Sequence, residues 1–190
     1  KDINKDKNIF NCIKSSSVGI GFGQPWYIKS KLLKKFRGNI FDFMGIPMPM
    51  YRGGAHYTWM ILNENRNGGC FLQNVEESTL QGYKDTNKYF FKKEYRYPKK
   101  LINPKDYFNY STKKEAKFLI TFLNKINSST SFNLKELDKK NSILFPRLVS
   151  EINSYINWDL DIDEIVKFIN AFSDPYPGGK SFLNKKKIYL

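Results

Sequence analysis

The sequence predicts an α/β fold, and the clearest sign of it is a strand–helix–strand pattern over residues 17–43. Residues 17–22 and 40–43 are short apolar runs of strand length, the first of them rich in glycine. Between them, residues 29–36 carry three apolar side chains separated by lysines, which is typical of a short surface helix. Short links between these elements favour a right-handed parallel crossover, the unit of an open α/β sheet.

The residues that follow predict a helix at 55–62 and a strand at 69–75. Residues 89–97 alternate aromatic and charged side chains, which indicates an exposed or edge strand. The longest helix is expected at residues 112–126, with Thr112 as N-cap and Glu115 completing a capping box. Its core-facing side chains would be Ala116, Leu119, Ile120 and Leu123.

The two ends of the chain differ in how clearly their sequences predict secondary structure. Residues 1–14 are mixed and low in apolar content, which indicates either a frayed start or the tail of a preceding unit. Residues 161–172 predict a helix capped by Asp161 or Asp163, ended by the prolines and glycines of residues 174–179. Two short apolar runs at the C-terminus predict a β-hairpin.

Composition limits the function classes. The apolar content of 41% and the aromatic content of 16% support a sizeable core, and no apolar run reaches the length of a membrane span. The two cysteines have neither metal spacing nor a disulfide framework, which favours a reducing cytoplasm. The net charge of +14 suits a polyanion partner, but the lysines are scattered and no nucleic-acid-binding motif accompanies them. We therefore attribute the charge to compositional bias and do not expect nucleic acid as partner.

The residues after the second predicted strand indicate a ligand site. The strand stops at Gly45, since Pro47 and Pro49 forbid both a helix and a central strand there. Residues 52–54 (Arg-Gly-Gly) then open the next helix. In open α/β sheets, ligands bind beyond the carboxyl ends of the strands, where backbone N–H groups and side chains converge.

Four blocks of the sequence, in order, carry a family resemblance. The segment from Gly45 to Asn63 resembles the central signature of the formyltransferases, a family that includes methionyl-tRNA formyltransferase and the sugar N-formyltransferases. The other blocks lie around residues 23–26, at Asp85-Thr86-Asn87, and in the segments 145–158 and 169–178. The 145–148 block (Phe-Pro-Arg-Leu) and the Ala-His-Tyr run at 55–57 are more similar to the sugar enzymes.

The resemblance implies a Rossmann-like catalytic domain that lacks its first strands and ends in a helix and a β-hairpin. We expect residues 1–127 to be the C-terminal part of the catalytic domain and residues 128–190 a family-specific extension. The additional C-terminal barrel of the transfer-RNA enzyme has no counterpart in the sequence.

The family's activity implies the ligands. The formyl donor would be 10-formyltetrahydrofolate and the acceptor the amine of a nucleotide-linked amino sugar; we also consider a homodimer. The residues in the folate-binding positions are Gly23, Gln24, Pro25, Trp26, Tyr27 and Asp85. The residues in the substrate-binding positions are Pro49, Arg52, Gly53 and His56, the last of which could equally serve packing.

The catalytic positions depart from the family pattern. Formyl transfer passes through a tetrahedral oxyanion, which needs hydrogen-bond donors and a group that takes the amine proton. The family uses an Asn and a His two residues apart on one strand face, with an Asp from a later loop. The corresponding positions here are Asp42, Met44 and Asp85. An ionised Asp only accepts hydrogen bonds and Met has no acid–base group. The sequence thus predicts either an impaired enzyme or a relative that binds nucleotide sugar or folate without turnover.

Overall fold

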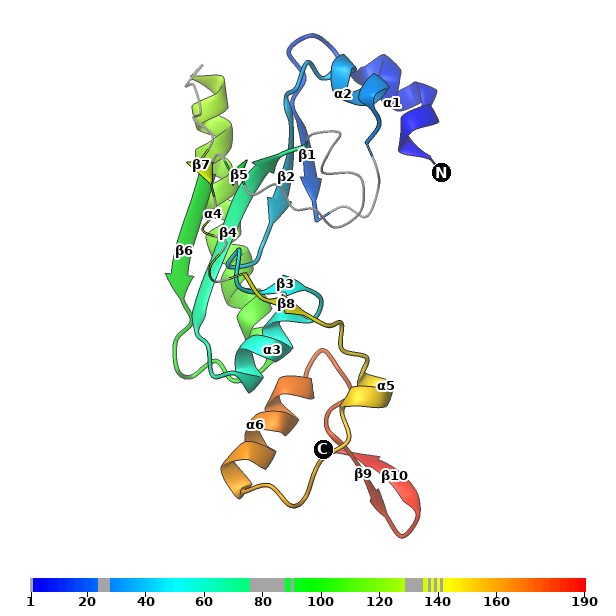
Figure 1. The fold of residues 1–190 in the computed structure, drawn as a ribbon, viewed down its shortest axis with the longest axis vertical. Coiled ribbons are helices and arrows are strands. Elements are labelled where there is room, and N and C mark those ends of the chain that lie inside the picture. Colours follow the sequence, from blue (N-terminus) through cyan, green and yellow to red (C-terminus); the bar gives the residue numbers. More distant parts are fainter. Residues whose placement is uncertain are drawn as a thin grey trace.

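The structure, a computed structural model, describes residues 2–23, 28–75, 88–89, 91–128, 135–136, 138, 140 and 142–190. Its centre is a four-stranded sheet with the order β1-β2-β4-β6 (Figure 1). The strands are β1 (Gly19–Phe22), β2 (Ile40–Met44), β4 (Asn67–Asn74) and β6 (Phe91–Arg96). β1 and β2 are parallel and are joined through α2 (Ser30–Lys35), whereas β4 and β6 run antiparallel to their neighbours. The predicted strand–helix–strand unit is confirmed, in a mixed sheet with β6 at its edge.

Side chains of β2 alternate between two differently covered faces of the sheet. Phe41 and Phe43 pack with Phe118 and Phe122 of the long helix α4 (Pro104–Asn127). On the other face, Ile40 belongs to a core cluster with Ile13, Ile28, Leu32 and Val75. Asp42 lies on this second face, between Ile40 and Met44. The α4 face is therefore a closed aromatic core, and the polar residue of β2 points away from it.

The long helix begins earlier than the sequence suggested. Asn103 is its N-cap and accepts a hydrogen bond from the Asp106 backbone N–H, with Pro104 in the first turn. Thr112 is inside the helix and donates to the Phe108 carbonyl oxygen, so the expected cap at Thr112 is wrong.

The expected core face of this helix is wrong for three of its four residues, whereas Leu119 does pack against the core cluster. The buried residues are Pro104, Tyr107, Ser111, Phe118 and Phe122. Ile120 is 58% exposed, Leu123 is 47% exposed and Ala116 is exposed as well. The helix carries two apolar stripes, and the aromatic one packs on the sheet.

The N-terminal residues form regular structure that the sequence did not indicate. A 3₁₀-helix, η1 (Ile3–Lys5), precedes α1 (Lys7–Cys12). Asp2 and Asp6 cap these two turns through hydrogen bonds to backbone N–H groups. Ile3, Ile9 and Phe10 then pack on the cluster around Leu32. Residues 2–14 are therefore not the frayed start that was one of the two interpretations of this segment.

The C-terminal part lies beyond one end of the sheet (Figure 1). It contains α5 (Ser150–Asn153), α6 (Ile162–Phe172), and a hairpin of β9 (Lys180–Leu183) and β10 (Lys186–Tyr189). Asp161 caps α6, as predicted. α6 packs on α3 (His56–Leu62), whose cluster holds Met60, Ile61, Ala171 and Phe172. The predicted terminal helix and hairpin are confirmed.

Two short strand pairs join distant segments. β3 (Arg52–Gly53) pairs in parallel with β8 (Leu144–Phe145), and β5 (Lys88–Tyr89) pairs with β7 (Lys135–Glu136). Among the residues that the structure describes, no helix is long and apolar enough to cross a membrane.

Candidate functional site

Asp42 lies at the centre of the predicted catalytic strand end and is 8% exposed. Its Oδ1 accepts a hydrogen bond from the Gly23 backbone N–H at 3.1 Å, and its Oδ2 accepts one from Gln73 Nε2 at 3.3 Å. Gln73 belongs to β4 and faces Asp42 directly across the strand pair. The carboxylate in the middle of β2 thus links Gly23, the residue after β1, to Gln73 of β4.

Gln73 is the residue of this site that sequence reasoning missed. It is 7% exposed and lies in a strand that was predicted from its apolar residues alone. Since an amide offers both a donor and an acceptor, Gln73 can pair with either Asp or Asn at position 42. The strand register alone could have identified it, because residues 42 and 73 are cross-strand partners.

Met44, the last residue of β2, is on the same face as Asp42, as strand alternation predicts. It packs against a small buried cluster of Ile46, Met48 and Phe71. A thioether in this position contributes packing, with neither a strong hydrogen-bond donor nor a proton acceptor for catalysis.

The predicted folate-binding positions are described only in part. Gly23 ends β1 with a positive φ of 58° and donates its backbone N–H to both Phe43 O and Asp42. Gln24, Pro25, Trp26, Tyr27 and Asp85 lie outside the described residues. Their predicted roles stay predictions.

The predicted substrate-binding loop forms a tight corner. Arg52 and Gly53 pair with Leu144 and Phe145, and the Arg52 guanidinium donates to Ser142 Oγ at 3.1 Å. A Cβ on Gly53 would collide with the Phe145 carbonyl oxygen, and its φ of 103° suits glycine alone. The glycine at 53 is therefore required for the approach of these two backbones.

Aromatic side chains lock this corner. Tyr51 stacks on Phe145 with ring centroids 4.8 Å apart, and Trp59 lies against the same ring at 5.2 Å. Trp59 Nε1 donates to the Pro146 carbonyl oxygen at 2.8 Å. We call residues 51–59 together with 144–147 the substrate corner. Pro49 precedes it after a cis peptide bond.

His56, the only histidine of the chain, opens α3 within the substrate corner. Its Nε2 is sealed from solvent and has no hydrogen-bond partner among the residues that the structure describes, and its ring packs on Tyr57 with centroids 3.9 Å apart. Burial lowers the pKa of His56 from the usual 6.5 to about 4. The imidazole is therefore neutral at pH 7, and its packing does not suit a proton carrier for the site at Asp42.

A second buried polar cluster lies on the α4 face of the sheet. A Cβ on Gly45 would be 2.7 Å from Glu115 Oε1, and Tyr95 donates to the same oxygen at 3.5 Å. Tyr57 and Ser111 share a hydrogen bond of 2.7 Å nearby. Burial raises the pKa of Glu115 and raises that of Tyr57 to about 12. Because residues 43 and 45 point to this face, the Glu115 carboxyl is separated by the strand from Asp42 and Met44.

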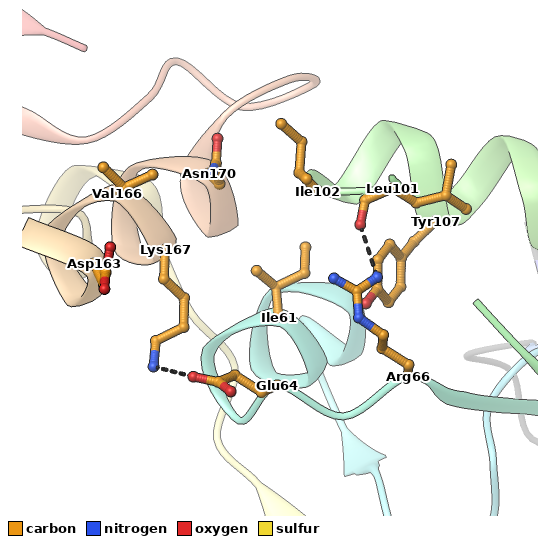
Figure 2. Close-up of a pocket in the computed structure, with 10 residues that line it drawn as sticks. All are labelled: Ile61, Glu64, Arg66, Leu101, Ile102, Tyr107, Asp163, Val166, Lys167 and Asn170. Carbon is orange, nitrogen blue, oxygen red and sulfur yellow. Dashed lines mark hydrogen bonds and ion pairs between the residues drawn. The ribbon is translucent and has the colours of Figure 1, made fainter. Parts of the chain in front are cut away.

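A pocket of about 300 Å³ lies elsewhere, between α3, α6 and residues 101–102 (Figure 2). None of the predicted site residues lines it. Arg66 donates to the carbonyl oxygens of Pro98 and Leu101, and Lys167 pairs with Glu64 at 2.9 Å. These charged groups connect the elements that form the walls of the pocket. The pocket therefore lies where these elements pack against one another. Within the described ranges, no group of His, Cys, Asp and Glu side chains could hold a metal ion.

The comparison with solved structures gives a consistent result. WlaRD, a sugar 3N-formyl transferase solved with dTDP and 5-N-formyl-THF, matches at a TM-score of 0.63 and 21% identity. A 4-N formyltransferase from Francisella tularensis matches at a TM-score of 0.69 and 14% identity, over 97% of this chain and 73% of the other. The chain has the formyltransferase fold. The predicted α/β class is thereby confirmed, down to the C-terminal helix and hairpin.

The match extends over most of this chain but not over most of every relative. It covers 90% of this chain and 59% of WlaRD. A variant of HypX from Aquifex aeolicus matches at a TM-score of 0.67 and 18% identity, over 91% of this chain and 29% of HypX. Neither the comparison with protein-family models nor that with curated proteins finds a match.

Proposed function

We propose that this formyltransferase-fold chain serves the transfer of a formyl group from 10-formyltetrahydrofolate to the amine of a nucleotide-linked amino sugar. The observation that carries the proposal is the paired geometry of the strand end and the substrate corner on this fold. Asp42 links Gly23, directly after β1, to Gln73 of β4, and residues 52–53 are held against 144–145. Support also comes from WlaRD, a sugar 3N-formyl transferase by name, and from the Francisella protein, a 4-N formyltransferase by name.

The reaction defines what the residues would do. The sugar amine forms a bond to the formyl carbon, the bond from that carbon to the donor nitrogen breaks, and one proton moves from the amine to tetrahydrofolate. Asp42 would accept a hydrogen bond from the attacking amine and orient it. Ionised, it offers the oxyanion no donor, and Met44 offers none either. Arg52 would bind a phosphate of the nucleotide, since a guanidinium suits planar recognition of phosphate oxygens.

A second function is favoured by the packing of Met44. The thioether sits in an apolar cluster with Ile46 and Met48, where the resemblance expects an imidazole. A chain with this strand end and a well-packed substrate corner would bind nucleotide sugar without turning it over. Loss of an oxyanion donor alone lowers rates by about 10²–10³.

One experiment separates the two functions. The 190-residue chain is incubated with 10-formyltetrahydrofolate and a panel of nucleotide-linked amino sugars, and formylated sugar is detected by mass spectrometry. Product formation supports the enzyme. Calorimetric binding of the nucleotide sugar without product supports the binding protein, and an Arg52→Gln variant should then bind more weakly. Neither product nor binding of sugar or folate would overturn both.

A further inference from the structure

The N-terminal part of the chain carries more than its share of the positive charge. Residues 2–37 contain eight lysine and arginine side chains and only two carboxylates, whereas residues 38–190 contain 23 and 16. All eight cationic side chains are exposed to solvent. We call them the basic surface, which consists of Lys5, Lys7, Lys14, Lys29, Lys31, Lys34, Lys35 and Arg37.

The fold gathers these side chains although they are scattered along the sequence. η1, α1 and α2 pack into one lobe around the buried side chain of Leu32. The Lys29 backbone N–H donates to Asn4 Oδ1 at 2.6 Å, and Lys31 Nζ lies 5.4 Å from the centroid of the Phe10 ring. This lobe and the C-terminal part lie at opposite ends of the molecule (Figure 1).

The charge of the basic surface is not neutralised within the described part of the chain. Asp2 and Asp6 supply the two carboxylates of the lobe, and each accepts hydrogen bonds from backbone N–H groups at a helix start. None of the eight cationic side chains forms an ion pair with another residue that the structure describes. Lys31, Lys34 and Lys35 have the spacing of neighbours on one face of α2. A surface of one sign attracts an extended partner of the opposite sign.

Two classes of extended anion have to be distinguished, nucleic acids and anionic lipid surfaces. Seven of the eight side chains are lysines, which act as hydrated point charges, whereas nucleic-acid recognition favours the planar fork of arginine. The rings of Phe10 and Phe36 pack on the cluster around Leu32, so the described helices of the lobe present no ring on which bases would stack. Lysine clusters on the exposed face of an amphipathic helix are typical of contact with anionic lipids.

We propose that the basic surface binds the anionic face of a phospholipid membrane. The attraction is electrostatic, because the apolar sides of α1 and α2 are already used in the cluster around Leu32 and are not free to enter lipid. The C-terminal part, at the opposite end of the molecule, stays accessible in this orientation (Figure 1). The contact does not depend on formyl transfer.

The first test measures binding of the full chain to large vesicles by cosedimentation. Vesicles of phosphatidylcholine with about 30% phosphatidylserine should bind the chain, and vesicles of phosphatidylcholine alone should not. Raising the salt from about 0.1 M to about 0.5 M should weaken the binding about tenfold or more, since salt screens exposed charges. No binding to the anionic vesicles, or equal binding to both kinds, would overturn the proposal.

Variants locate the contact on the molecule. The triple variant Lys31→Gln, Lys34→Gln, Lys35→Gln should weaken binding to the anionic vesicles about 100-fold, because each lysine near such a surface contributes about fivefold. The double variant Lys5→Gln, Lys7→Gln tests the other side of the lobe and should weaken binding about 25-fold.

The matched control removes three exposed lysines outside the lobe. It carries Lys99→Gln, Lys100→Gln and Lys113→Gln, with the same change in net charge as the α2 variant, and should keep its affinity within about threefold. Circular dichroism confirms the folding of each variant. An equal loss in the control would mean that the net charge rather than the basic surface determines binding, and would overturn the proposal.

A final measurement compares the membrane with nucleic acid. The wild-type chain is titrated with a single-stranded RNA of mixed sequence at the same salt, and its affinity is expressed per accessible phosphate. Weaker binding to RNA than to the anionic vesicles supports the membrane. Tighter binding to RNA would assign the basic surface to nucleic acid and overturn the proposal.

Discussion

The substrate corner and the predicted catalytic strand end lie on the same fold and differ in how far each keeps the pattern that formyl transfer would need. In the corner, the glycine at 53 sits where only glycine fits, and two aromatic rings lock the contact with Phe145. At the strand end, the backbone geometry is in place but Asp42 and Met44 supply neither oxyanion donor nor imidazole. A site can therefore keep its shape while its reactive groups are absent.

The largest effect is expected from restoring the strand end. The double variant Asp42→Asn, Met44→His should raise the rate of formyl transfer by about 10⁴ or more, through one amide donor and one acid–base group. Gln73 can turn its amide to pair with the new Asn, so the fold should tolerate the change. Initial rates with the best sugar of the panel measure the gain. The two single variants serve as controls, and an unchanged rate in the double variant would mean that something other than the strand end limits activity.

The next effect concerns the backbone approach in the substrate corner. Gly53→Ala should lower the free energy of unfolding by about 3–4 kcal/mol, because a methyl group meets the Phe145 carbonyl and the positive φ is strained. Gly38→Ala is the control, with a φ of 81° and open space around it, and should cost about 1 kcal/mol. Urea denaturation measures both. Equal losses would show that only φ matters and that the corner is loosely packed.

Because of His56, the free energy of unfolding should depend on pH. Its folded pKa of about 4 lies below the usual 6.5, so the unfolded chain binds a proton more readily between these values. The folded state should lose about 2–3 kcal/mol as the pH falls from 6.5 to 4. The buried Glu115, whose pKa is raised, acts in the opposite direction.

The contribution of the histidine is isolated by difference. Unfolding free energies of the wild type and of His56→Gln are compared across this pH range, and the extra loss should vanish in the variant. Parallel pH curves would mean that the imidazole is exposed to solvent and free to contact substrate, as the sequence resemblance allowed.

The smallest effect concerns the hydrogen bond that links α3 to residue 146. Trp59→Phe keeps an aromatic ring beside Phe145 and removes the Nε1 donor from the Pro146 carbonyl, and the lost hydrogen bond should cost about 0.5–1 kcal/mol. Trp158→Phe removes a bond to Ser181 in a more exposed place and should cost less. Thermal unfolding of both variants measures the difference; a larger loss from Trp158→Phe would reverse the ranking of the two contacts.

Sequence reasoning succeeded where one local pattern determined the structure. The strand–helix–strand unit followed from periodicity, and the start of α6 followed from Asp161 as its cap. The long helix was misjudged because two apolar stripes compete on it, and tertiary packing selected the aromatic one with Phe118 and Phe122. Thr112 and Glu115 have the spacing of a capping box, although both lie inside the helix.

The candidate site was predictable in part for a related reason. Alternation along β2 placed Asp42 and Met44 on one face, since that depends on a single strand. Gln73 and the pairing of residues 52–53 with 144–145 depend on how distant strands meet, which no local pattern encodes. The folate roles of residues 24–27 and 85, and the division of the chain at residue 127, stay predictions.

The pairing of β3 with β8 also orders events during synthesis. The Arg52 guanidinium finds its hydroxyl partner at Ser142, and Trp59 finds its carbonyl partner at Pro146. A chain emerging from the ribosome exposes Arg52, Gly53 and Gly54 long before their partners have been made. The substrate corner therefore closes late: a nascent chain that has emerged past β6 but not yet to residue 147 holds all four strands of the central sheet and still lacks the partners of this corner.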